Sequence, residues 1–307
     1  MPLRLPLQWL RHHPRTVAFL ILAGVTLWQG WAFFSDDWRA VLNQWHSHAV
    51  CIMAALACNV VGLGCDFWAW RSAYSLHGLR LPLRQGLAAY LSGFAAQLVP
   101  LQLGRVLRPD SVSRLQGAPF SRALLAEVSL FALDVAALGC SILAFVSGMY
   151  YLPLLFCVFG CFAVGVYMVP RFVPVSWAQR LGFQQLSVGA RKRILAVWAL
   201  RCFDWTALAV VLVLLVRPWA TQTNPLQIMA GALAASVVGT GSGLPGGIGA
   251  TEGSLAFFLS LSAISAAYGA VVVFLYRLIT FWAQIPLGWL ALLYVRALEK
   301  KLSRYGS

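Results

Sequence analysis

Charged side chains lie deep inside apolar runs of this sequence, where they could bind a charged ligand or pair with one another. The deepest are Asp134, Arg201, Asp204, Glu252 and Arg277, and Glu127 lies nearer the end of its run. An ionised group at the centre of a membrane helix costs about 2.5–3.5 kcal/mol on insertion scales, so each such group needs a partner, a cavity or a function. These residues are therefore the first candidates for a functional site.

The spacing of these residues shows which of them can pair within one helix and which would have to meet from different segments. Arg201 and Asp204 are three residues apart, so one helix brings them close enough to form a structural ion pair, which is the interpretation favoured here over a functional one. Asp134, Glu252 and Arg277 lie on separate segments, and they would meet only in a polar cavity. For these three, a binding role is favoured over simple mutual neutralisation.

A glycine-rich segment adds backbone groups to this set. Residues 239–249 contain six glycines and a proline, a composition that cannot form a regular helix. Irregular backbone at membrane depth is tolerated only beside protein or water. Its exposed amides, together with a helix that starts near Ala250, would seat an anionic group such as a lipid phosphate. Gly246, Gly247 and Gly249 are the candidate binding glycines, and a plain tight turn between two spans is the alternative.

A second Pro/Gly interruption occurs at Leu98–Arg105, in the corresponding position of the first half. Such a pair of broken segments is the best sequence indication of an inverted repeat with a site at the midplane. The broken segments are 86–105 in a first half of about 16–170, and 239–252 in a second half of about 194–295. Both halves belong to one integral membrane domain, residues 1–307.

The elements that position these residues must be membrane helices. The chain has 307 residues, of which 60% are hydrophobic and 10% charged, which excludes an ordinary soluble domain. Several continuous apolar runs reach the roughly 20 residues that a spanning helix needs, and continuous rather than alternating apolarity excludes a β-barrel. The basic excess of +14 is scattered between these runs, so nucleic-acid binding has no support. The sequence predicts an all-α polytopic membrane protein.

The cations predict the orientation, because Lys and Arg accumulate on the cytoplasmic side. With the amino terminus inside, Thr16–Ser35 forms a retained first span and segment 86–105 forms a re-entrant hairpin between two basic flanks. On this path 19 of the 23 cations, including Arg105 and Arg108, are cytoplasmic, and both termini are inside. Residues 226–295 cross either once, with a second hairpin, or three times, so six and eight spans both remain open.

Specific motifs resemble a known family. Gly243–Glu252, Tyr276–Trp282 and Pro286-Leu287-Gly288 are similar to the carboxy-terminal signature of the lysylphosphatidylglycerol synthase transmembrane, flippase-like family. The first half follows the family's order with Ala89–Gly93, Pro100, Gly104, Arg108, Gly117 and Asp134. The resemblance covers most of the chain and is strongest in the last 65 residues.

The chain also departs from the family pattern. Arg105 stands where the family often has an acid, Leu130 and Phe131 replace an acidic-basic pair, and Thr251 stands where a basic or amide residue is common. These departures leave the lipid head group open.

The resemblance implies a flippase-like protein of the bacterial inner membrane that moves an anionic or phosphate-bearing lipid (glycosylated, aminoacylated or polyprenyl) between leaflets. The substrate-binding residues expected on this basis are Arg105, Arg108, Asp134, Arg201, Asp204, Gly246, Gly247, Gly249, Glu252 and Arg277. No catalytic residue, metal or cofactor is expected. Because the sequence ends about ten residues after the last span, a separate lipid-modifying enzyme is the expected partner.

Two other functions stay open. One is a non-catalytic lipid-binding accessory protein of a membrane lipid, hopanoid or glycolipid pathway. The other is an enzyme acting on a prenyl or lipid phosphate, which is disfavoured because Asp36-Asp37 is the only adjacent acid pair and has no third acid nearby to hold Mg²⁺.

Overall fold

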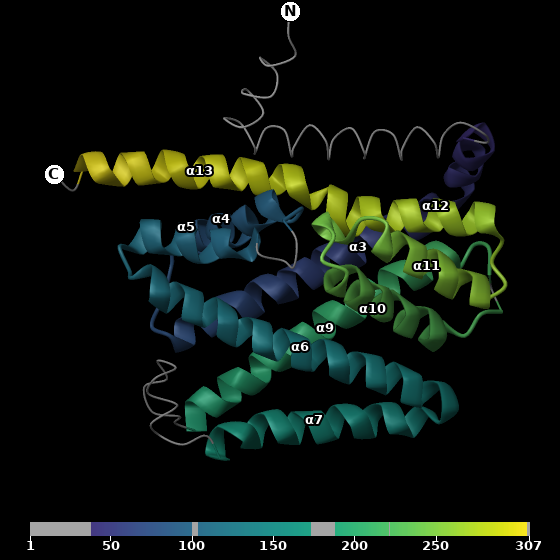
Figure 1. Ribbon diagram of the computed structural model, residues 1–307, viewed down its shortest axis with the longest axis horizontal. Coiled ribbons are helices and arrows are strands. Elements are labelled where there is room, and N and C mark those ends of the chain that lie inside the picture. Colours follow the sequence, from purple (N-terminus) through teal and green to yellow (C-terminus); the bar gives the residue numbers. More distant parts are fainter. Residues whose placement is uncertain (1–37, 100–103, 173–187, 221, 306–307) are drawn as a thin grey trace, which may run out of the picture. The chain divides into compact units, whose positions relative to one another are not determined.

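The computed structural model describes residues 38–99, 104–172, 188–220 and 222–305, and these residues form helices and turns without a strand (Figure 1). The chain divides into two compact units, residues 1–49 and 50–307. Of the first unit, only the start of helix α3 (Trp38–Leu76) is described, and the second unit holds the packing and the site discussed below. The predicted first span, Thr16–Ser35, and the acid pair Asp36-Asp37 lie outside the described residues.

The first broken segment forms a helical hairpin. Helix α4 (Leu83–Ser92) continues into the short 3₁₀ helix η1 (Gly93–Ala96), and the chain becomes helical again at α5 (Leu107–Gln116), which packs against α4. Each α-helix has ten residues and is about 15 Å long, half of a hydrocarbon core of about 30 Å. Segment 86–105 is thus not one continuous helix, and Pro100 lies outside the described residues.

Two long helices follow, α6 (Phe120–Tyr150) and α7 (Leu152–Phe172), joined at the extended residue Tyr151. After residues 173–187, helix α9 (Val188–Val216) begins the second half.

The second broken segment is also a hairpin. Helix α10 (Pro225–Gly241) starts at Asn224, whose side chain accepts a hydrogen bond from the Leu226 amide at 3.0 Å. The chain then turns through the 3₁₀ helix η3 (Pro245–Gly247) into α11 (Ala250–Leu261). Helices α10 and α11 pack against each other.

The last helical stretch has three parts. Helix α12 (Ala266–Arg277) continues through a π-helical turn, η4 (Leu278–Trp282), into α13 (Gln284–Tyr305). In both halves the order is therefore a long helix, a helical hairpin and a long helix. This recurrence of elements is what a structural repeat requires.

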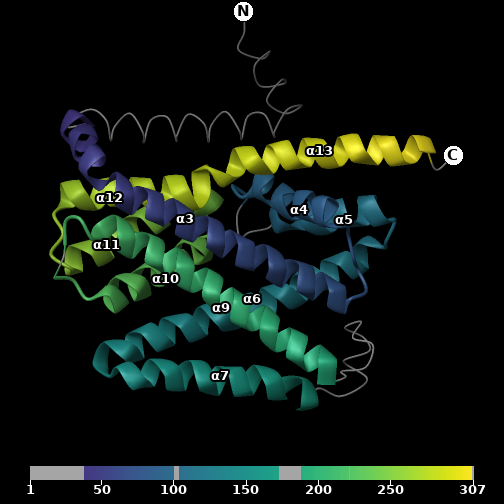
Figure 2. The ribbon, with the colours of Figure 1, turned by 180° about the vertical axis from the view of Figure 1, so that it is seen from behind.

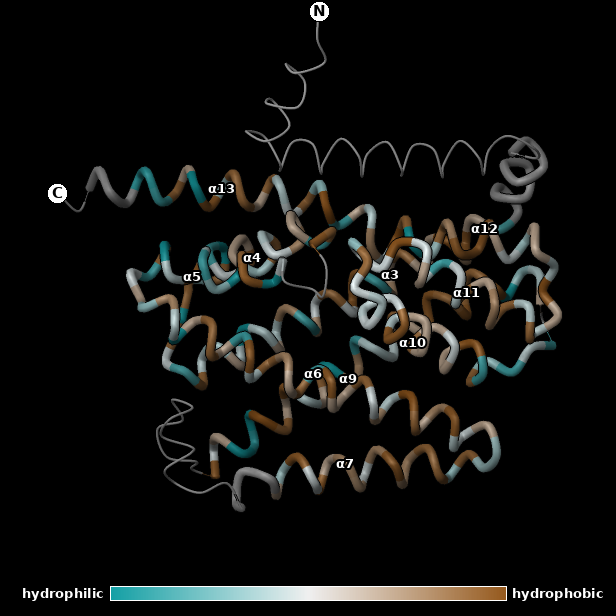
Figure 3. Tube along the Cα trace, in the orientation of Figure 1, coloured by the Kyte–Doolittle hydropathy of each residue, from teal (hydrophilic) through white to brown (hydrophobic). Residues whose placement is uncertain are grey.

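The described residues include four helical stretches that are long and apolar enough to cross a membrane: His48–Leu76, Phe120–Tyr150, Val188–Val216 and Ala266–Lys301. Leu152–Met168 and Pro225–Gly241 are shorter apolar helices. Many large apolar side chains on them are exposed, and Figure 3 shows the brown of apolar residues along α6 and α7, with more teal in α5. The protein is a multi-pass, all-α membrane protein.

Small residues allow the helices to approach closely. Helix α6 packs against α5, α7, α9 and α10, and α13 packs against α4, η1 and α5 (Figures 1 and 2). A Cβ added at Gly288 of α13 would lie 2.8 Å from the Phe94 Cβ of η1. Because lipid tails are as apolar as the side chains, helix association in a membrane depends on such close packing.

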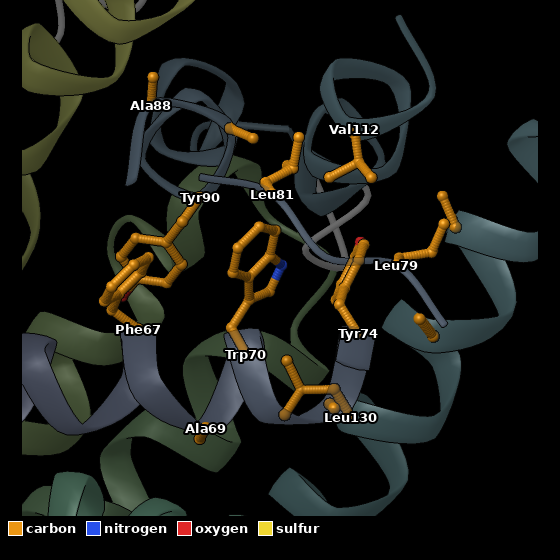
Figure 4. Close-up of a cluster of buried hydrophobic side chains, with 14 of the residues drawn as sticks. Phe67, Ala69, Trp70, Tyr74, Leu79, Leu81, Ala88, Tyr90, Val112 and Leu130 are labelled. Carbon is orange, nitrogen blue, oxygen red and sulfur yellow. The ribbon is translucent and has the colours of Figure 1, made fainter. Parts of the chain in front are cut away.

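An aromatic cluster holds the first hairpin against α3. Figure 4 shows Trp70 between Tyr90 of α4 and Tyr74 of α3, and the Trp70 ring centroid lies 5.9 Å from that of Tyr90 and 4.5 Å from that of Tyr74. Phe67 makes an edge-to-face contact with Tyr90, with the ring centroids 5.5 Å apart. This packing fixes Tyr90, which contacts the charged residues described next.

Candidate functional site

The break in the first hairpin carries two arginines into the interior of the second unit. Gly93 makes room for one of them, because an added Cβ would lie 2.6 Å from the Arg108 Nε. The Arg108 guanidinium donates a hydrogen bond from Nε to the Tyr90 carbonyl at 3.1 Å and lies 4.5 Å from the centre of the Tyr90 ring. Arg108 is 3% exposed.

Arg201 of α9 is the centre of an ion-pair network. It forms ion pairs with Asp66 of α3, Asp134 of α6 and Asp204 of its own helix, the last at 2.9 Å. Its Nε also donates to the Asp134 Oδ1 at 2.8 Å. The predicted Arg201–Asp204 pair is present, but it is one contact of a network that joins three helices.

The other members of this network extend it to both sides. Asp134 accepts hydrogen bonds from Arg105 at 2.9 Å and from the Trp205 indole at 2.8 Å. Asp66 accepts a hydrogen bond from the Tyr90 hydroxyl at 2.7 Å and lies 3.9 Å from an Arg108 nitrogen.

Glu127 completes the network on the far side of Arg108. It lies 3.5 Å from that guanidinium and accepts a hydrogen bond from the Tyr74 hydroxyl at 2.9 Å. We name this set the first cluster; it comprises Asp66, Arg105, Arg108, Glu127, Asp134, Arg201 and Asp204.

A second cluster joins the glycine-rich turn to the π-helical turn. The Arg277 Nε donates to Glu252 at 2.7 Å, and its terminal nitrogen donates to the Gly246 carbonyl at 2.8 Å. The guanidinium also lies 4.0 Å from the centre of the Phe281 ring. Since π-helical turns frequently occur at functional sites, the position of Arg277 directly before η4 is notable.

The glycines of the turn are needed for its backbone. Gly246 and Gly247 have φ values of 61° and 66°, in the left-handed region that glycine adopts readily. A Cβ on Gly246 would lie 2.5 Å from the Phe281 Cζ, so the ring packs directly on the backbone.

The amides of this turn are used locally rather than presented to a ligand as the sequence suggests. The Gly247 amide donates to the Leu244 carbonyl at 2.9 Å, and the Ile248 amide donates to the Pro245 carbonyl at 3.1 Å. The Gly249 amide donates to the Glu252 carboxylate at 2.7 Å, so the Glu252 side chain caps the start of α11. These three amides are therefore not free to bind a ligand, and the cationic groups of the site are its arginines.

One cavity of about 220 Å³ receives residues from both hairpins. The predicted site residues that line it are Arg105, Arg108, Arg201, Asp204, Gly246, Gly247 and Arg277. Asp134, Gly249 and Glu252 do not line it; Asp134 and Glu252 hold lining arginines from behind. The structure thus brings the two clusters to one cavity, and two of the predicted acids, Asp134 and Glu252, lie behind the arginines that line it.

Arg105 and Arg108, which the sequence predicts on the cytoplasmic side of the first hairpin, do not lie in an open loop in the structure. Arg108 is 3% exposed and the side chain of Arg105 is 23% exposed, each paired with a carboxylate. A hairpin with a break carries its central cations inward.

Asp66 was missed as a site residue. It follows the uncharged run 49–65, so it reads as the polar end of a span, but α3 continues to Leu76 and keeps Asp66 in the helix interior. Its isolation in apolar sequence was the available signal. The cavity also receives Asn59, Tyr276 and Gln284, which are 8%, 2% and 6% exposed.

Among the described residues, no group of three or more His, Cys, Asp and Glu side chains is arranged to hold a metal ion. The charged groups of the site are therefore arginines and carboxylates paired with one another.

Comparison with known proteins gives one family. The family model described as Lysylphosphatidylglycerol synthase TM region matches residues 15–288, a stretch that contains both hairpins and the cavity. No curated protein and no solved structure matches the chain.

Proposed function

The chain belongs to the lysylphosphatidylglycerol synthase TM region family, and from this premise we propose that it is a flippase-like transporter that moves a phosphate-bearing lipid between membrane leaflets. The acyl or prenyl chains would stay in the lipid while the head group passes through the cavity.

One observation carries this proposal: four arginines, two from the first hairpin and one each from α9 and α12, line one cavity in a helical protein that exposes many large apolar side chains. They are Arg105, Arg108, Arg201 and Arg277. Guanidinium groups bind phosphate through several parallel N–H donors, and in a low-dielectric interior such charge-assisted hydrogen bonds are strong.

The network that holds these arginines also suits a transient ligand. Arg105 and Arg277 line the cavity, and each pairs with one carboxylate that lies behind it. A phosphate could replace that carboxylate as the partner of the guanidinium, and the displaced carboxylate would then need another cation or a proton.

The proposal includes no covalent chemistry. The lipid leaves the protein chemically unchanged, a separate enzyme would make or modify it, and the site uses no cofactor. We further propose that the protein resides in the inner membrane of a bacterium with both termini in the cytoplasm.

A non-catalytic lipid-binding role is the second candidate, and one feature favours it. Each arginine of the cavity already has a carboxylate partner, an arrangement that suits a site that holds a head group and does not pass it on.

The test is a flip assay in proteoliposomes that contain phosphatidylglycerol with a fluorescent acyl chain, in which a membrane-impermeant reductant quenches only the outer leaflet. The wild-type protein is expected to accelerate flipping, and Arg277→Gln is expected to slow it by about 10–100-fold, the equivalent of losing one charged hydrogen bond. Arg217→Gln is the matched control, since Arg217 is exposed and lies outside the cavity.

Two outcomes discriminate between the candidates. Wild-type protein that binds the labelled lipid in detergent but leaves the flip rate at that of protein-free vesicles, with several anionic lipids tried, would exclude transport and support the accessory role. Loss of flipping in Arg277→Gln with lipid binding retained would support transport.

A further inference from the structure

The first cluster has one carboxylate too many. Its ion pairs connect four carboxylates with three guanidiniums, and the pair Arg277–Glu252 adds no net charge to the cavity. A surplus negative charge inside a membrane protein is costly, so it needs a cation or a proton.

The contacts locate the surplus at Asp204. Glu127, Asp134 and Asp66 each accept a hydrogen bond from a tyrosine, tryptophan or arginine donor in addition to their ion pairs. Among the described residues, Asp204 has only the pair of its Oδ2 with Arg201, which Asp66 and Asp134 share. It is thus the least compensated carboxylate of the cluster.

Asp204 also faces the cavity. It lines the cavity, and its side chain is 19% exposed, against 5%, 7% and 13% for those of Asp134, Glu127 and Asp66. Gly62 of α3 makes room for its second oxygen, because an added Cβ would lie 3.1 Å from Oδ1. This oxygen has no hydrogen-bond partner within the described ranges and is the atom that a proton would occupy.

Apart from Arg201, the groups around Asp204 bring little positive charge. The Tyr276 hydroxyl, in a residue that is 2% exposed, lines the same cavity and brings no positive charge to it. The titratable groups that act on Asp204 from the elements around it, besides Arg201, are Cys65, Asp66, Tyr90, Arg105, Asp134 and Tyr276. Of these, only Arg105 brings positive charge, and it is already paired with Asp134.

We propose that Asp204 is a proton-binding site that couples lipid movement to proton transfer, an inference that rests on the proposed function. An anionic head group entering the cavity would add a second uncompensated negative charge. A hydronium ion reaching the cavity through its water then protonates Asp204: one O–H bond of the hydronium breaks, the Oδ1–H bond forms and water is left. When the head group leaves, the Oδ1–H bond breaks and the proton returns to water. The cavity is large enough for several waters.

The first measurement needs no transport. Infrared difference spectra of the purified protein, recorded from acid to alkaline pH, should show the C=O band of a protonated carboxylic acid that titrates in the wild type and is missing in Asp204→Asn. Asp110→Asn is the control, because Asp110 is a surface partner of Arg114 and should leave the band unchanged. No titrating band that depends on Asp204 in the folded protein would overturn the proposal.

The second measurement is the flip rate in the same proteoliposomes at several pH values. The wild-type rate should change with pH by up to about tenfold per unit where Asp204 titrates, and the Asp204→Asn rate should be independent of pH. A wild-type rate that is constant with pH, or a pH dependence retained in Asp204→Asn, would refute the coupling.

The two measurements fail differently. A titrating Asp204 band in a protein that flips no lipid would refute the proposed function and leave the proton site standing. A protein that flips lipid but shows no such band would support the proposed function and refute the proton site. If Asp204→Asn does not fold, Asp204→Glu provides the second variant, which should keep the band but shift its position or midpoint.

Discussion

Arg201 is the residue on which the first cluster depends. It is 3% exposed and forms ion pairs with three carboxylates on α3, α6 and α9. Replacing it with glutamine would leave those carboxylates with too few cations in a low-dielectric interior. We expect Arg201→Gln to lower the free energy of unfolding by about 3–5 kcal/mol, the usual cost of breaking a buried pair by removing one partner.

Thermal unfolding of the detergent-solubilised protein, followed by tryptophan fluorescence, measures this effect. Arg217→Gln, which removes an exposed arginine just after the same helix, should leave the melting temperature nearly unchanged. Equal melting temperatures for the two variants would mean that Arg201 does not hold the three carboxylates together.

Most of the charged residues of the two clusters could be identified from the sequence. Asp134, Arg201, Glu252 and Arg277 stand out because each is isolated in apolar sequence, and all four lie in the two clusters. Their partners could not be deduced, since pairing across helices depends on packing that hydropathy does not encode. Asp66 was missed because it follows an uncharged run and reads as the polar end of a span.

The glycine-rich turn is the element that sets the shape of the second half of the cavity. Gly246 has a φ of 61° and supports the Phe281 ring, whose centre lies 4.0 Å from the Arg277 guanidinium. Gly246→Ala would add about 1–2 kcal/mol of left-handed backbone strain and about 1–3 kcal/mol of overpacking. We expect a lower melting temperature and a slower flip rate, because the ring and the arginine must move together.

Gly253→Ala is the matched control for this substitution. Gly253 lies in the first turn of α11, where an added Cβ would meet open space. Alanine there should be neutral or stabilising by up to about 1 kcal/mol, because glycine weakens a helix interior. A Gly246→Ala variant as stable as Gly253→Ala would show that the turn tolerates a different backbone.

The two breaks are the elements that sequence composition predicts best, since proline and glycine act locally. The π-helical turn after Arg277 was not predicted, because nothing in Leu278–Trp282 is incompatible with an ordinary α-helix. Its geometry depends on the contacts of Arg277 and Phe281 with the turn, which are long-range. Composition also could not predict that Glu252 both caps α11 and forms the ion pair with Arg277.

On the scale of the whole molecule, the path through the membrane follows from charge and length together. The excess of cations predicted for the cytoplasmic side persists when the buried Arg105 and Arg108 are left out of the count. Helix α11 has 12 residues and is about 18 Å long, too short to cross a core of about 30 Å. These lengths favour the six-span alternative, with both hairpins entering and leaving on one side.

This path can be tested with single cysteines in a variant whose seven native cysteines are replaced. Three helices, α6, α7 and α9, separate Ser121 from Gln222, and both positions are exposed. An impermeant maleimide should therefore label Ser121→Cys only in inside-out vesicles and Gln222→Cys only in intact cells, with the cysteine-free protein as the control. Leu244→Cys, in the glycine-rich turn, should resist labelling from the cytoplasmic side, because a returning hairpin ends within the membrane. Efficient cytoplasmic labelling at that position would require α10 and α11 to cross completely, and would replace six spans with eight.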